Sequence, residues 1–229
     1  MNNQISIVQV QSKFLSRVYS WMSFGLILTA ITAFYVANNP LIVHFIYGKN
    51  WIFFSLLIIK FVMCVTISSA LDSISARTAK WVFLAYSILT GIMLSVIFFV
   101  YPVASIAKIF FIASSMFASL AIYGHFTKSD LSGMGTFLFM SLIGLIISQF
   151  FGWFLNSPEF DWVTSGIGVM IFSLLTAYDT QKIKNMAQEV YETNDDYLKL
   201  SIYGALQLYL DFINLFLYLL SFIYGKKKN

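Results

Sequence analysis

Four ionisable side chains lie inside long apolar stretches of this sequence: Lys60, Lys108, Asp179 and Asp211. A charge at membrane depth costs roughly 3 kcal/mol on insertion scales, so such a residue usually marks an ion path, a charge pair or a water-filled cavity. Lys108 lies close to the Pro102 turn, from which its long stem can snorkel to an interface. Lys60 lies nearer the middle of its stretch, where both snorkelling and pairing with an acid are open. Asp211 is the strongest candidate for a functional group.

Asp211 belongs to a polar face on an otherwise apolar helix that we predict over 204–224. Polar and small residues recur there at steps of three and four, which places them on one side of a helix. They are Gly204, Gln207, Asp211, Asn214, Tyr218 and Ser221. Such a stripe on a membrane-spanning helix faces the interior of the bundle. The pattern favours a functional cavity or ion path, with a purely structural hydrogen-bond network as the alternative.

Asp179 closes the sixth apolar stretch, in the segment Thr176-Ala-Tyr-Asp-Thr-Gln181. One interpretation is an acid near the cytoplasmic interface that pairs with Lys182 or Lys184. The other is a partner for Asp211. The sequence by itself leaves both interpretations open.

The depth of each aspartate decides between these interpretations. At 1.5 Å per residue, a last helix that enters the membrane near Leu206 carries Asp211 roughly 8 Å deep, not far from the depth of Asp179. A helix that enters at Leu200 separates the two acids. Two carboxylates that meet cannot both ionise cheaply and share one proton. Such a pair is a pH-sensitive latch or an oxygen-rich cation site.

These four groups belong to a membrane protein. The chain has too few charged residues to cover the surface of a soluble domain. Of its 229 residues 59% are hydrophobic and 10% charged, whereas a soluble domain is about 25% charged. Crossing a bilayer takes roughly 20 helical residues, and the apolar runs are too long and continuous for barrel strands. We predict an all-α integral membrane protein, a single membrane domain over 1–229, with seven helices at about 18–37, 51–71, 82–101, 103–123, 133–155, 162–181 and 204–224.

The distribution of Lys and Arg predicts the orientation, because cytoplasmic loops carry an excess of them. Eight such residues share one side: Lys13, Arg17, Arg77, Lys80, Lys128, Lys182, Lys184 and Lys199. The other side holds Lys49 and the tail, Lys226, Lys227 and Lys228, which we interpret as a membrane-surface anchor or a solubilising end. We therefore expect a cytoplasmic N-terminus and an external C-terminus.

Small residues at four-residue spacing predict where helices approach one another closely. They occur at Gly91 and Ser95 in the third predicted helix, and at Gly144, Ser148 and Gly152 in the fifth. Packing inside one bundle explains such stripes better than a dimer interface.

The sequence contains no recognisable motif for catalysis, metal binding or nucleic-acid binding. His44 and His125 are isolated in the sequence, without the spacing of metal ligands. The sequence contains no P-loop, HExxH or Gly-x-Ser-x-Gly segment, and no basic patch with interleaved aromatic residues. We expect no enzyme activity, no bound cofactor and no nucleic-acid partner.

Two segments resemble the signature segments of the Bax inhibitor-1 (transmembrane Bax inhibitor motif) family: Leu175-Thr-Ala-Tyr-Asp-Thr-Gln-Lys182 and Leu208-Tyr-Leu-Asp-Phe-Ile-Asn-Leu-Phe216. Two supporting stretches are Tyr86-Ser-Ile-Leu-Thr-Gly-Ile-Met-Leu-Ser95 and Lys128-Ser-Asp-Leu-Ser-Gly133. The resemblance covers about 18–224 and is greatest to bacterial inner-membrane members. It implies a seven-helix bundle with a central C-terminal helix in the cell inner membrane.

The resemblance also implies an activity, a pH-sensitive calcium (cation) leak gated by an intramembrane pair of aspartates. Asp179 and Asp211 match the paired acids, and would act as ion path, pH sensor and transient Ca²⁺ ligands. Residues expected to support them as a polar face are Gln207, Asn214, Thr176 and Tyr178, and candidate basic partners are Lys60 and Arg77. The alternative is a non-conducting regulator in the lipid bilayer that binds other membrane proteins, such as a membrane protease. A secondary transporter would show internal repeats, and we find no clear repeat.

Overall fold

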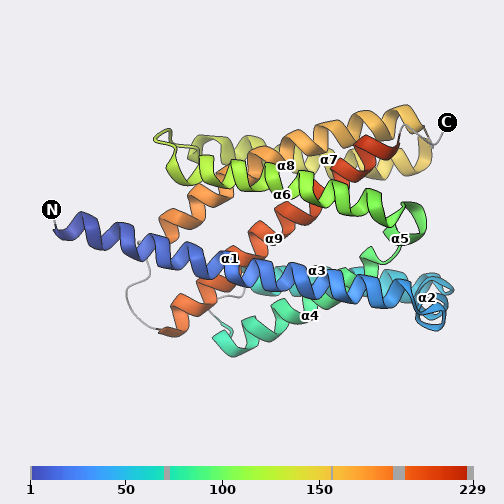
Figure 1. Ribbon diagram of the computed structural model, residues 1–229, viewed down its shortest axis with the longest axis horizontal. Helices are drawn as coiled ribbons and strands as arrows, with labels where there is room; N and C mark the ends of the chain where they lie inside the picture. Colours follow the sequence, from blue (N-terminus) through green and yellow to red (C-terminus); the bar gives the residue numbers. More distant parts are fainter. Residues whose placement is uncertain (1, 70–72, 156, 188–193, 226–229) are drawn as a thin grey trace. The chain divides into compact units, whose positions relative to one another are not determined.

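The computed structural model describes residues 2–69, 73–155, 157–187 and 194–225, nearly all of them helical (Figure 1). The helices are α1 (Asn2–Ala37), α2 (Pro40–Tyr47), α3 (Asn50–Ser69), α4 (Ala76–Leu94), α5 (Ile97–Val100), α6 (Val103–Phe126), the short 3-10 helix η1 (Ser132–Met134), α7 (Gly135–Leu155), α8 (Pro158–Met186) and α9 (Asn194–Tyr224). No strand occurs within the described ranges, which confirms the predicted all-α class.

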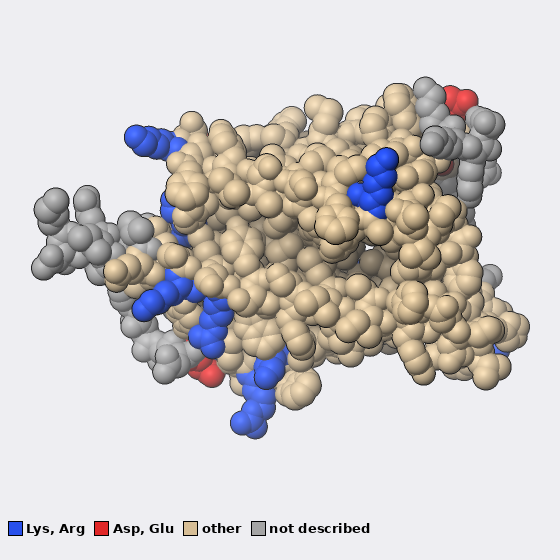
Figure 2. Space-filling model, in the orientation of Figure 1, with Lys and Arg blue, Asp and Glu red and all other residues tan. Residues whose placement is uncertain are grey.

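Seven helical stretches are long and apolar enough to cross a bilayer: Gln9–Ala37, Trp51–Ser69, Ala76–Val100, Val103–Phe126, Ser132–Gly152, Pro158–Met186 and Asp195–Tyr224. Their outward faces carry large apolar side chains, such as Phe61 at 71% exposure and Phe111 at 73%. In the view of Figure 2 most of the surface carries neither Lys and Arg nor Asp and Glu. So much apolar surface would be unfavourable in water. We therefore conclude that these faces contact lipid.

Several helices are longer than the apolar segments that predict them. The first begins at Asn2 rather than near residue 18, the sixth runs from Pro158 to Met186, and the last begins at Asn194 rather than near 204. Hydropathy detects only the part of a helix inside the hydrocarbon, whereas the helix continues for as long as its backbone groups bond one another. The end of the second predicted helix, 70–71, and the lysine anchor at 226–228 lie outside the described residues.

The third predicted helix, 82–101, starts earlier than predicted and is interrupted before its end. It begins at Ala76, where the hydroxyl oxygen of Ser75 accepts a hydrogen bond from the backbone N–H of Thr78 and caps the first turn. It is broken after Leu94 and resumes as α5. At the break the hydroxyl of Ser95 donates to the carbonyl of Ile92, 2.7 Å away, a local bond that competes with regular helix geometry.

The residues divide into two compact units, and α9 contributes to both. Unit 1 comprises Met1–Val103 and Met186–Tyr209, and unit 2 comprises Ala104–Asn185 and Leu210–Asn229. Of the seven spans α9 is the most buried, with 56% of its most apolar window inside the protein. This burial agrees with the central C-terminal helix that the resemblance implies.

In unit 1, α1 and α4 pack closely and run parallel. Gly25 lies against the ring of Phe83, and further along both helices Gly91 lies against the backbone of Thr29. A methyl group at Gly91 would come within 2.5 Å of the Thr29 carbonyl oxygen, so this close approach depends on glycine, as its spacing predicts.

The small stripe on α7 follows the prediction at Gly152, which is buried against Phe160 and Asp161 of α8, but not at Gly144. Gly144 is exposed, and among the described residues no atom outside its own helix turn lies within 4 Å of the place where a Cβ would stand. The predicted close helix contact at Gly144 is therefore wrong. Periodicity identifies the residues that share a face, but it does not say whether that face meets a helix or lipid.

Candidate functional site

Helices α8 and α9 form an antiparallel pair in unit 2 that determines where both aspartates lie. Three side-chain pairs set the register: the stacked rings of Trp162 and Phe222, the hydrogen-bonded hydroxyls of Ser165 and Ser221, and the stacked rings of Phe172 and Tyr218. Residues later in α8 thus lie opposite residues earlier in α9. Gly168 makes the approach possible, because a methyl group there would lie 2.5 Å from the Tyr218 ring.

This register brings Asp179 opposite Asp211. The two side chains are 7% and 4% exposed, and their carboxyl groups lie within hydrogen-bonding distance of each other. A hydrogen bond between two carboxyl groups requires a proton on one of them. Among the described residues, Oδ2 of Asp211 is buried without a hydrogen-bond donor. The two predicted site residues therefore form one buried pair that can hold a single proton.

Two lysines that follow Asp179 on α8, Lys182 and Lys184, make different interactions. Lys182, one turn beyond Asp179 on α8, attracts the Asp179 carboxylate electrostatically. Lys184 turns instead to α6 and donates to the carbonyl oxygen of His125 at 2.7 Å. Asp179 thus combines features of both interpretations that the sequence leaves open, since it contacts Asp211 and also lies near Lys182.

The polar face of α9 borders a cavity of about 350 Å³ in unit 2, lined by Gln149, Ser165, Asn214, Leu217, Tyr218 and Ser221. Asn214, one turn from Asp211, donates from its Nδ2 to the carbonyl of Leu210 at 2.8 Å and leaves its amide oxygen for the cavity. Gln149 reaches in from α7 and donates to the Tyr218 hydroxyl at 3.5 Å. A polar cavity of this size has room for several water molecules.

The remaining residues of the predicted polar face have other surroundings. The hydroxyl of Thr176 is fully buried and donates to the carbonyl of Phe172 within its own helix at 2.8 Å. Tyr178 packs its phenol group over Gly135 at the start of α7. Gln207 belongs to unit 1, where its Oε1 is buried and has no hydrogen-bond partner among the described residues. Within the described residues of unit 2, neither Thr176 nor Tyr178 has a hydrogen bond to an aspartate carboxyl.

Gln181 is a positioning residue that the sequence reasoning missed. Its Oε1 accepts from the backbone N–H of Leu131 and its Nε2 donates to the carbonyl of Ser129, both at 2.8 Å. The loop between α6 and η1 is thereby fastened to α8 two residues after Asp179. In the same loop the backbone N–H of Ser132 donates to Asp130 and holds the pKa of that exposed carboxyl below its usual value. Gln181 belongs to the segment 175–182 and the loop to the segment 128–133, and both segments resemble stretches of the family named above. This resemblance is the signal in the sequence that could have indicated a role for Gln181.

The two candidate basic partners lie in unit 1. The ammonium of Lys60 lies 5.1 Å from the centroid of the Tyr86 ring, a cation–π contact, and Arg77 is exposed at the start of α4. Pairing of either residue with the aspartates stays a prediction.

Unit 1 also has a buried polar cluster that the sequence reasoning missed. The fully buried Tyr209 brings its hydroxyl to within 2.6 Å of the Thr29 hydroxyl oxygen. Thr29 in turn lies 2.9 Å from the carbonyl oxygen of Ser87 on α4. Tyr209 stands two positions before Asp211, so α9 supplies a buried polar group to each unit.

These features define an integral membrane protein with seven helical stretches able to cross a bilayer and a buried pair of carboxyl groups on the last two. Residues 11–229 match the family described as Inhibitor of apoptosis-promoting Bax1, and the chain belongs to this family. The inner membrane protein YbhL of Escherichia coli K12 is 42% identical over 97% of both chains. An uncharacterised protein of Borreliella burgdorferi is 39% identical over 97% of this chain and 95% of its own. The protein YrjE of Lactococcus lactis is 34% identical over 90% and 88% of the two chains.

Proposed function

We propose that the protein is a pH-sensitive calcium (cation) leak channel of the cell inner membrane, with its N-terminus in the cytoplasm. The observation that carries the proposal is the contact between the buried carboxyl groups of Asp179 and Asp211. Membership of the family and the inner-membrane name of the Escherichia coli relative support the location. The excess of Lys and Arg on one predicted side supports the orientation.

The pair responds to pH through its shared proton. While one carboxyl carries the proton, a hydrogen bond joins Asp179 to Asp211 and holds α8 and α9 together at this level. Once the proton leaves, two negative charges about 4 Å apart repel by roughly 4 kcal/mol at an effective dielectric constant near 20. The repulsion is relieved when the helices separate or when a cation enters between the carboxylates.

Calcium is the cation that such a pair suits best. Ca²⁺ takes six to eight oxygen ligands, whereas two carboxylates offer at most four oxygens. Water in the neighbouring cavity and the amide oxygen of Asn214 can complete the shell during passage. An incomplete protein shell favours a transient stop on an ion path over tight storage.

Calcium flux into proteoliposomes between pH 5 and 8 tests the proposal. We expect wild-type flux to rise with pH as the shared proton is lost. In Asp211→Asn the amide donates to Asp179 at every pH, so we expect a low flux without pH dependence. Asp161→Asn, an exposed aspartate at the other end of α8, is the matched control and keeps the wild-type profile. Flux no higher than in empty liposomes at any pH, from folded protein, would refute the leak and favour the non-conducting regulator.

A further inference from the structure

A second cavity in unit 1 combines one lysine with two tryptophans. It measures about 410 Å³ and is lined by Ser20, Trp21, Phe24, Lys80, Trp81 and Leu84. The ammonium of Lys80 lies 5.7 Å from the ring centroids of both Trp21 and Trp81. The two indole rings therefore hold the charge at the cavity, where it is only half-exposed.

The parallel packing of α1 and α4 gives this cavity a polar end and an apolar end. One turn towards the start of each helix lie Arg17 and Arg77, both exposed. One turn in the opposite direction lie Phe24 and Leu84, which line the cavity. Cations, indole rings and then aliphatic and aromatic carbon follow one another along the same direction. A phospholipid has the same order of headgroup, glycerol and acyl chain.

Positive charge prevails at the polar end. Besides Arg17, Arg77 and Lys80, the exposed Lys13 stands one turn before Arg17. Two acids reach this end from α9: a carboxylate oxygen of Asp195 accepts from the backbone N–H of Ala76 at 3.4 Å, and Asp196 pairs with Lys199 at 3.3 Å. The described residues of this end thus keep an excess of cations. Figure 2 shows Lys and Arg side chains projecting over the region where α1 and the start of α4 lie in Figure 1.

We propose that this cavity is a binding site for an anionic phospholipid such as phosphatidylglycerol. The phosphate lies against Lys80 between the two indole rings, and Arg17 and Arg77 face the rest of the headgroup. One acyl chain follows Phe24 and Leu84 into the hydrocarbon. Basic pockets between transmembrane helices on the cytoplasmic side recognise acidic lipid headgroups in this way, and tryptophan favours the level of the membrane interface. The site does not depend on the proposed leak.

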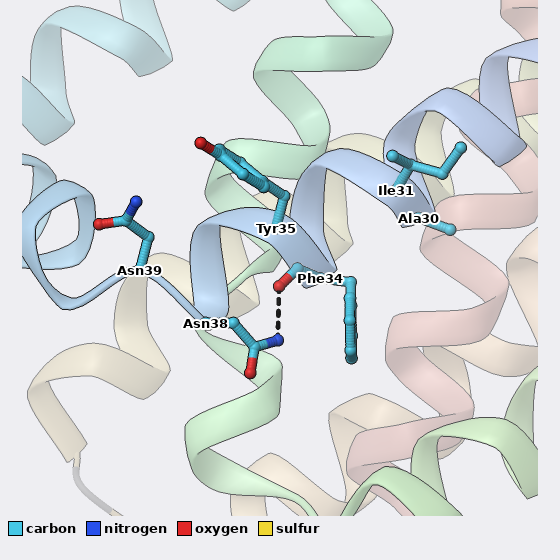
Figure 3. A pocket seen from close by; sticks show the side chains of 6 residues that line it. All are labelled: Ala30, Ile31, Phe34, Tyr35, Asn38 and Asn39. Carbon is cyan, nitrogen blue, oxygen red and sulfur yellow. Dashed lines mark hydrogen bonds between the residues drawn. The ribbon is translucent and has the colours of Figure 1, made fainter.

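A cavity at the other end of α1 serves as a comparison, because it lacks the features that would select an anionic headgroup. It measures about 590 Å³ and is lined by Ala30, Ile31, Phe34, Tyr35, Asn38 and Asn39 (Figure 3). The amide of Asn38 is directed to the carbonyl of Phe34 within the helix, at 2.8 Å (Figure 3). With no charged residue in its lining, this cavity can accept an acyl chain but does not distinguish headgroups by charge.

Native mass spectrometry of the full-length protein with phosphatidylglycerol and phosphatidylcholine of matched chains tests the site. We expect the wild type to bind phosphatidylglycerol more tightly than phosphatidylcholine. Lys80→Gln should weaken phosphatidylglycerol binding about fivefold, the factor that one lysine at the surface contributes, and leave phosphatidylcholine binding unchanged. Lys80→Arg keeps the charge and should keep the selectivity. Lys108→Gln, an exposed lysine of α6, is the matched control.

Two results would overturn the site. The first is equal affinity of the wild type for the two lipids, a measurement that needs no variant to fold. The second is a loss of phosphatidylglycerol selectivity that is the same in Lys80→Gln and Lys108→Gln, since charge alone would then explain it.

Discussion

Replacing Gln181 by alanine should release the loop between α6 and η1 from α8. The side chain makes two hydrogen bonds of 2.8 Å to that loop, one from the N–H of Leu131 and one to the carbonyl of Ser129. Each such bond contributes about 0.5–1.5 kcal/mol net, so their joint loss costs about 2 kcal/mol. At a factor of ten for every 1.4 kcal/mol, the open state of the loop becomes roughly 30 times more populated.

Amide hydrogen exchange at Leu131 measures this opening directly, because exchange of a protected amide follows the free energy of local opening. We expect the exchange rate of Leu131 to rise roughly 30-fold in Gln181→Ala. Gln181→Glu should fall between this variant and the wild type, since its carboxylate still accepts from Leu131 but cannot donate to Ser129. Gln149→Ala is the control, because Gln149 makes a longer bond of 3.5 Å elsewhere in unit 2. An unchanged Leu131 rate in Gln181→Ala would refute the reasoning.

Three further substitutions test the packing of the two units by thermal unfolding. Gly168→Ala should lower the unfolding free energy by about 1–3 kcal/mol, because its Cβ would lie 2.5 Å from the stacked ring of Tyr218. Gly144→Ala, on an open helix face, should keep or slightly raise the stability, and equal losses in the two variants would contradict this account. Tyr209→Phe should cost about 1 kcal/mol, because it removes the hydroxyl that lies 2.6 Å from Thr29. An unfolding midpoint identical to that of the wild type would show that this buried bond contributes nothing.

The sequence predicts a membrane protein because the hydropathy of a helix shows whether its surroundings are lipid or water. A chain with 10% charged residues and apolar runs of helical length has few alternatives to a bundle of membrane-spanning helices. The ends of those helices were harder to predict. The polar continuation of α9 back to Asn194 has no hydropathy signal, although its backbone bonds continue unchanged.

The candidate site was partly predictable for a related reason. A charge at membrane depth stands out against an apolar background, so Asp179 and Asp211 were identified as single residues. The polar face of α9 was also predictable, since helical periodicity groups Asn214, Tyr218 and Ser221, which line one cavity. The distance between the two carboxyl groups was not, because it depends on where α9 begins to cross the membrane.

The sequence alone thus determined the solvent of this protein, the number of its spans and the faces of its helices. Only the tertiary structure decided which faces meet. It placed Asp179 against Asp211 through the antiparallel register of α8 and α9, directed Gln181 to a loop some 50 residues earlier in the chain, and left Gly144 exposed. It also brought the ammonium of Lys80 to within 5.7 Å of the ring centroids of both Trp21 and Trp81. The physical reason is that local patterns are set by helix geometry within one segment, whereas contacts between segments depend on the packing of all of them together.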